Sequence, residues 1–262
     1  MRTLLTLLTL LATSAVAPAQ TFDAEKSLQE LNKWYASTLK SLSKETKGSF
    51  IPIGDVYRSV GDDRQQRALA LVGKVPPHAI PPRQSLAAAE LYCYADLASN
   101  KVAAAKRFLT TKPEPSLRYQ AHYLLLEGYE RLSDAAGLRS VLREIKPPST
   151  KKALQLMNET ASVYTRVIAA KLGADIALEV LRRVESLAPP DALVKDKKEG
   201  DLAENVVANL AGTRASLLSS LGRTGEARRV LQGARSKVKQ PLNLSILDRA
   251  ANELGPVTPP KK

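Results

Sequence analysis

The chain has 262 residues, of which 44% are hydrophobic and 25% are charged, and this composition is sufficient to bury a core in one or two globular domains. Aromatic residues make up only 5% of the chain, and alternating runs of β-branched residues are nearly absent from the sequence, which argues against a sheet and favours helices. The formal net charge of +13 favours anionic partners over cationic ones.

Residues 1–19 have the pattern of a secretory signal peptide. Arg2 supplies the positive charge, an apolar run covers residues 4–11, and Ala17-Pro18-Ala19 fits a cleavage site before Gln20. The apolar run is too short and too rich in Thr for a membrane anchor. We therefore expect an exported protein, periplasmic or secreted and of bacterial type, with no transmembrane segment in the mature chain.

Residues 20–82 are predicted to be an N-terminal helical region that ends in a proline-rich connector. Leu, Trp and Tyr recur at steps of three and four over residues 22–47, which predicts a first helix. Residues 47–55 are predicted to form a loop. A second helix is expected over residues 55–75, with an interruption at Gly61-Asp62. Four prolines in residues 76–82 exclude a helix there and predict a stiff extended connector.

Residues 83–254 are predicted to be a domain of helical repeats. A shift of 34 residues superposes Ala87 on Ala121, Leu91 on Leu125 and Phe108 on Leu142. Each unit has the pattern of two helices separated by a short polar break, at residues 99–101 and 133–137, where Asn and Asp are suitable helix caps. Antiparallel hairpins of this kind bury only one side, so they stack in rows.

Two further hairpins are predicted over residues 150–190 and 202–239, separated by a charged linker at 191–201. Residues 241–254 are predicted to form a last, capping helix, and residues 255–262 a disordered tail. In the last hairpin, Gly222 and Gly225 bracket the turn. Ala227 and Ala234 are predicted to mark the place where the partner helix crosses, on a face shared with Val230, Leu231 and Val238.

This pattern of small residues resembles the tetratricopeptide repeat (TPR), whose 34-residue unit has small residues at fixed places and a Pro near its end. Ala215, Ala227 and Ala234 take the small positions, and Leu231 takes the large apolar one. Ala211 and Arg214 depart from the usual Trp and Leu. The resemblance covers roughly residues 83–240 and implies an all-α fold, a right-handed α-solenoid of stacked antiparallel hairpins. Stacked helical hairpins of a generic type are the alternative.

The resemblance also implies a function, because such repeats bind peptides or partner proteins on the concave face formed by the first helix of each hairpin. We therefore expect a non-enzymatic scaffold or adaptor for another envelope or extracellular protein. The residues that the resemblance places on this face are Tyr123, Glu127, Glu130, Ser162, Arg166, Asn209, Gly212 and Ser216.

An alternative function follows from charge. Residues 211–240 hold seven Lys or Arg against one acid, Glu226, and such a segment attracts polyanions such as wall polymer, anionic lipid or extracellular DNA. The basic surface is predicted to comprise Arg223, Arg228, Arg229, Arg235, Lys237 and Lys239.

Motifs for catalysis, cofactors or metals are not found in the sequence. The chain has neither a phosphate-binding Gly-rich loop nor a nucleophile elbow, and its two histidines, His78 and His122, do not have the spacing of zinc ligands. Cys93 is the only cysteine, so the chain has no internal disulfide, and its apolar surroundings predict a small core residue. We expect no metal and no cofactor. A cell-wall hydrolase, which would use a carboxylate pair such as Glu127 and Glu130, is kept as a second alternative.

Overall fold

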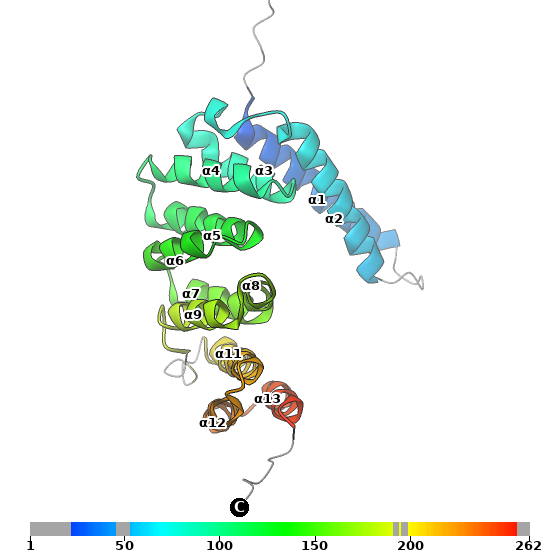
Figure 1. Ribbon diagram of the computed structural model, residues 1–262. Coiled ribbons are helices and arrows are strands. Elements are labelled where there is room, and N and C mark those ends of the chain that lie inside the picture. The colour runs from blue at the N-terminus through cyan, green and yellow to red at the C-terminus, as the bar shows by residue number, and fades with distance from the viewer. Residues whose placement is uncertain (1–21, 46–52, 191–193, 195–198, 256–262) are drawn as a thin grey trace, which may run out of the picture.

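The structure is a computed structural model that describes residues 22–45, 53–190, 194 and 199–255. These residues are helical, and no strand occurs among them. Figure 1 shows pairs of helices that follow one another down the molecule, with the α1–α2 hairpin leaning away from the other pairs. The predicted signal peptide, most of the predicted linker at 191–201 and all of the predicted tail except Gly255 lie outside the described residues.

The N-terminal hairpin consists of α1, Ala24–Glu45, and α2, Ile53–Val72. The interruption predicted at Gly61 is wrong, because α2 runs through it without a break. A glycine inside a helix costs only about 1 kcal/mol relative to alanine, and the rest of the helix tolerates it. The guanidinium of Arg64 joins the hairpin to the next helix, because it stacks 4.2 Å from the ring centre of Tyr35 and 3.5 Å from that of Tyr94.

The proline-rich connector was predicted to be extended throughout, and this prediction is wrong. The connector contains two short 3₁₀ turns, η1 at Pro77–Ala79 and η2 at Pro82–Gln84, each with a proline at its start. The fixed φ of proline suits the first position of a helical turn, where its missing N–H is not needed. Only the residues beside these turns, such as Pro76 and Ile80, have extended backbone.

The next two pairs are α3, Ser85–Tyr94, with α4, Ala98–Leu109, and α5, Pro115–Arg131, with α6, Ala135–Glu144. Asp134 caps α6 as predicted, since its side chain accepts a hydrogen bond from the Gly137 N–H at 2.9 Å. The break predicted at residues 99–101 is wrong, because these residues form the first turn of α4. The chain reverses earlier, at Asp96, which has a positive φ of 56°.

The same turn occurs three times among the residues that the structure describes. Asp96, Ser133 and Gly222 each have a positive φ. In each case the following N–H donates to a carbonyl five residues back, from Leu97 to Tyr92, from Asp134 to Tyr129 and from Arg223 to Leu218. This is the Schellman ending of a helix, which satisfies carbonyls that the helix itself leaves open. Gly222 is the glycine that this position favours; the sequence predicted this turn and the break at residues 133–137, but not the turn at Asp96.

These turns correct the predicted repeat length. Asp96 and Ser133 are 37 residues apart, and a shift of 37 rather than 34 pairs the buried positions of α4 and α6, with the exception of Val102, which falls on the exposed Arg139. Phe108 then corresponds to Ile145, not to Leu142, and Ala105 corresponds to Leu142. At this shift Lys101, which is 4% exposed, corresponds to the fully buried Leu138. A lysine therefore occupies a core position of the first unit.

The third pair is built on a helix with a π-helical turn. It comprises α7, Thr150–Glu159, the π-helical segment η3, Thr160–Tyr164, and α8, Thr165–Leu172, followed after Gly173 by α9, Ala174–Glu185. The buried hydroxyls of Thr160 and Thr165 donate to backbone carbonyls of Leu156 and Thr160 within the same helix. Such backbone bonding is typical of sites where a helix departs from α geometry.

The C-terminal part consists of α11, Gly200–Ser220, α12, Thr224–Arg235, and α13, Pro241–Glu253. The predicted linker therefore ends at residue 199, two residues earlier than expected. On α12, Ala227, Leu231 and Ala234 are buried as predicted, Val238 just beyond it is buried too, and Val230 is half-buried.

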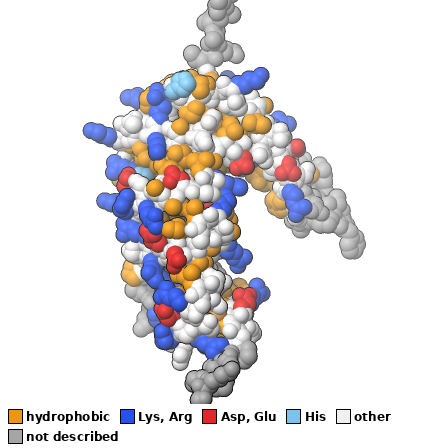
Figure 2. Space-filling view, viewed as in Figure 1, with side chains coloured by type: hydrophobic (Ala, Val, Ile, Leu, Met, Phe, Trp, Pro, Cys, Tyr) orange, Lys and Arg blue, Asp and Glu red, His pale blue; other side chains and the backbone are white. Residues whose placement is uncertain are grey.

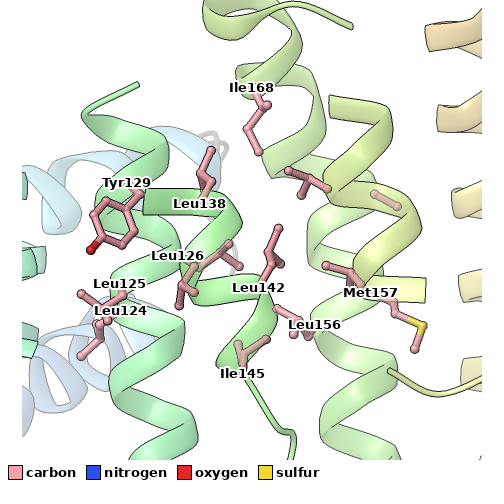
Figure 3. Packing of buried hydrophobic residues seen from close by; sticks show 14 of the residues in the cluster. Leu124, Leu125, Leu126, Tyr129, Leu138, Leu142, Ile145, Leu156, Met157 and Ile168 are labelled. Atoms are coloured by element: carbon pink, nitrogen blue, oxygen red, sulfur yellow. The ribbon is translucent and has the colours of Figure 1, made fainter. Parts of the chain in front are cut away.

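The core is a continuous series of aliphatic side chains between successive pairs. Figure 3 shows Leu126, Leu142 and Leu156 lying between α5, α6 and the following helices, and all three are buried. Burial of each such side chain contributes about 1.5–3 kcal/mol to folding. The apolar faces of the helices therefore hold the pairs together, and polar side chains fill the remaining positions between them.

Candidate functional site

Tyr123 and Glu127, two of the predicted groove residues, lie in one network of hydrogen bonds. The Tyr123 hydroxyl lies 2.8 Å from the Tyr164 hydroxyl and donates to Oε2 of Glu159 at 2.7 Å. The Tyr164 hydroxyl donates to Oε1 of Glu127 at 2.8 Å. Burial and the neighbouring carboxylates raise the pKa of both tyrosines, so both hydroxyls stay protonated and donate.

The network continues into the core through Lys101 and Cys93. Nζ of Lys101 lies 3.6 Å from Oε2 of Glu127 and 3.5 Å from Sγ of Cys93. The thiol itself lies 3.5 Å from the same carboxylate oxygen. Burial raises the pKa of the Cys93 thiol to about 11, with Glu127 adding to the shift, so the thiol is protonated and weakly reactive. Cys93 is half-buried at the edge of the core, rather than wholly inside it as predicted.

Glu130 does not join these residues. It is buried, and its Oε1 lies 3.3 Å from Nζ of Lys171 on α8. Its carboxylate therefore ties the second pair of helices to the third. Tyr123, in contrast, also lines a cleft of about 480 Å³ between α5 and α7, together with Tyr119, Gln120, Gln155 and Glu159.

The other five predicted residues, among them Arg166, Asn209 and Ser216, line one cleft together. This cleft of about 240 Å³ lies between α8, α11 and α13, and Ser162 and Gly212 also line it. Arg166 and Ser216 are exposed, and Asn209 is half-buried. Sequence reasoning missed the residues that α13 contributes to this cleft, Ile246, Arg249, Ala250 and Glu253.

Asn209 belongs to a row of amide side chains that crosses three helices. Its Nδ2 donates to Oδ1 of Asn158 at 2.7 Å and to Oδ1 of Asn205 at 3.0 Å, and Asn205 donates in turn to Asn243 at 3.0 Å. The row ends at the buried carboxylate of Glu204, which accepts the backbone N–H groups of Lys239 and Gln240 at the start of α13. Burial raises the pKa of Glu204, but these hydrogen bonds outweigh it and lower the pKa overall.

The predicted basic surface is largely engaged by the chain itself. Arg223 forms a two-pronged ion pair with Glu226, and Arg235 pairs with Asp248. Arg228 donates to the backbone carbonyls of Leu254 and Gly255. Arg214, on α11, pairs with Glu185. Of the remaining predicted residues, Arg229 and Lys237 line a small cleft beside α11, and Lys239 donates its backbone N–H to Glu204. Much of the charge of residues 211–240 is therefore balanced locally.

The imidazole of His122 is buried in the second pair of helices, while His78 is exposed in η1. Nε2 of His122 lies 3.6 Å from the carboxylate of Glu144, and its buried Nδ1 has no hydrogen-bond partner within the described chain. Burial lowers the pKa of His122, and Arg118 adds to this shift, against the opposing effect of Glu144. The folded protein therefore favours the neutral imidazole.

The lowered pKa of His122 predicts that the protein loses stability in mild acid. The unfolded chain, with a histidine pKa near 6.5, takes up a proton before the folded protein does, so the free energy of unfolding falls as the pH drops below about 6.5. Chemical denaturation at about pH 7.5 and about pH 5.5 measures this loss, and each unit by which the pKa is lowered contributes up to ~1.4 kcal/mol. His122→Gln is expected to reduce the loss. An equal loss in the variant would show that His122 does not cause it.

Within the residues that the structure describes, no helix is long and apolar enough to cross a membrane. The described residues also contain no group of three or more His, Cys, Asp or Glu side chains that could hold a metal ion. No protein-family model matches the chain, and comparisons with curated proteins and with solved structures give no match either.

Proposed function

We propose that the protein is an exported scaffold, a right-handed α-solenoid of TPR-like hairpins, that binds a polypeptide segment of another envelope or extracellular protein. The observation that carries this proposal is the cleft between α8, α11 and α13. Its lining includes Arg166 on α8 and, more than 40 residues later, Asn209 and Ser216 on α11, so it joins the first helices of two successive hairpins.

The chemistry of the cleft suits a peptide better than a purely apolar or purely charged ligand. The carbonyl oxygen of Asn209 and the hydroxyl oxygen of Ser162, whose hydrogens are donated within the chain, offer acceptors, and the exposed Ser216 hydroxyl can donate or accept, as peptide groups require. Arg166 and Arg249 add positive charge on opposite sides, and Glu253 adds negative charge. The hydrogen bonds of Asn209 to Asn158 and Asn205 hold its amide in place before a ligand arrives, which lowers the entropy cost of binding.

A pull-down of mature protein from the native envelope fraction, at low and high salt, tests this proposal. We expect one protein to be retained at both salt concentrations. The double variant Arg166→Glu/Ser216→Trp should reduce its retention about tenfold or more, since both side chains are exposed and their replacement fills the cleft without disturbing the core. Arg229→Glu, which makes the same charge reversal on α12, serves as the control and should retain the partner.

The results also separate the alternatives. Equal retention by the double variant and the wild type would refute the cleft as the binding site. Retention of polyanions at low salt alone would favour a polyanion-binding protein, because such binding falls steeply with salt. Release of soluble fragments from purified wall material would favour the hydrolase.

A further inference from the structure

A further cleft, of about 460 Å³, lies between α6, α9 and the start of α12. It is lined by five arginines and two acids, with Leu142 and Leu178 among its other residues, and the arginines are Arg139, Arg143, Arg182, Arg183 and Arg223. Figure 2 shows Lys and Arg side chains gathered on this side of the molecule, at the left of the view, with a smaller number of acids among them. Because a guanidinium stays protonated in proteins, the cleft keeps a net positive charge.

Three of the five guanidinium groups are held in position by the chain. Arg139 forms a two-pronged ion pair with Glu179, at distances of 2.8 to 2.9 Å. Arg183 donates its Nε–H to the carbonyl of Leu142 at 2.9 Å, and Arg223 pairs with Glu226. These contacts fix one arginine on each of the three helices that surround the cleft.

The other two arginines are not used in this way. Arg143 and Arg182 are exposed, and they form no hydrogen bond or ion pair within the part of the chain that the structure describes. Grouping like charges around one cleft destabilises the folded state through their repulsion. The acids that line the cleft, Asp175 and Glu179, together with Glu226, whose pKa is lowered by its pairing with Arg223 and also by Arg182, are still fewer than its five arginines. The arrangement therefore has a cost in stability that an anionic ligand would remove.

We propose that this cleft binds a phosphate-bearing ligand, with Arg143 and Arg182 as its direct partners. The planar fork of a guanidinium matches two oxygens of a phosphate group, which makes arginine the preferred residue for such recognition. Leu142 and Leu178, both about 3% exposed, belong to the core and close the floor of the cleft, so the arginines supply its contact surface. The site differs from the basic surface predicted for residues 211–240, with which it shares only Arg223.

Two probes distinguish the sources of phosphate. Isothermal titration with pyrophosphate measures binding of a free phosphate compound, and flotation with vesicles of equal parts phosphatidylglycerol and phosphatidylcholine measures binding of a lipid headgroup. Both use the mature chain and the double variant Arg143→Gln/Arg182→Gln. The control is Arg166→Gln/Arg249→Gln, which removes the same charge from the other cleft.

We expect binding of at least one probe, weakened about tenfold or more in Arg143→Gln/Arg182→Gln and little changed in the control. Binding of pyrophosphate identifies a soluble phosphate compound as the ligand, and binding of the vesicles alone identifies a lipid headgroup. The proposal is overturned if neither probe binds, if the two double variants lose affinity equally, or if an acidic peptide binds and neither phosphate probe does. These experiments measure binding of phosphate probes and the pull-down measures retention of a protein, so failure of either proposal leaves the other standing.

Discussion

Gly137→Ala is expected to destabilise the protein by about 1–3 kcal/mol, although alanine is the better helix former. A Cβ at residue 137 would lie 2.3 to 2.6 Å from ring atoms of Tyr129, far inside van der Waals contact. The ring cannot move aside easily, because Tyr129 is buried in α5 and Lys106 lies over it, 5.5 Å from its centre. The substitution therefore forces α5 and α6 apart.

Urea denaturation of the wild type and the variant measures this effect. Gly233→Ala on α12 is the matched control, because nothing lies within 4 Å of a Cβ at that position. The control should stabilise the protein by about 0.5–1 kcal/mol through helix propensity alone. If both variants are stabilised, α5 and α6 do not approach each other as closely as described.

Lys101→Met is expected to destabilise the protein by about 2–3 kcal/mol. The substitution keeps the length of the side chain but leaves the carboxylate of Glu127, whose side chain is 23% exposed, without its cation. Breaking a buried ion pair from one side is costly because the remaining charge stays partly desolvated. The partial exposure of Glu127 places the expected effect below that of a fully buried pair.

The double variant Lys101→Met/Glu127→Gln tests whether the unpaired charge on Glu127 causes this loss of stability. Glutamine still accepts a hydrogen bond from the Tyr164 hydroxyl but carries no charge, so the double variant should recover half or more of the lost stability. A double-mutant cycle from four denaturation curves gives the coupling between the two residues. A double variant that is less stable than Lys101→Met would show that the charge on Glu127 is not the cause.

The apolar pattern of the sequence was sufficient to predict helices, because burial on one face imposes the same spacing wherever a helix packs. Ala227, Leu231 and Ala234 show this on α12, where all three are buried as expected. The predicted repeat length of 34 residues was wrong because an apolar pattern alone does not fix the register of two similar hairpins. Alanine and leucine are so frequent in residues 83–147 that shifts of 34 and 37 both superpose apolar residues, and only the turns at Asp96 and Ser133 distinguish them.

The candidate sites depend on contacts that local patterns do not determine. Tyr123 and Tyr164 are 41 residues apart, and the π-helical turn in η3 alters the face on which Tyr164 lies. The resemblance to TPR proteins brought Arg166, Asn209 and Ser216 to one face because it aligned whole hairpins. The resemblance did not place Arg143 and Arg182 together, because they lie on the second helices of different hairpins. The net charge along the sequence also does not show which arginines are paired with acids.

Side-chain polar contacts link the second helix pair to the third at several points, among them Tyr164 with Glu127, Lys171 with Glu130, and Arg139 with Glu179. Such contacts lose their strength over a short separation and can be replaced by water, whereas the apolar contacts inside each pair must be exposed in full. For a molecule stretched between its two ends, these polar contacts therefore break before the buried leucines of the same junction, Leu126, Leu142 and Leu156, are exposed. The chain would then lengthen slightly under tension and recover its shape when the tension ends, with each helix pair intact.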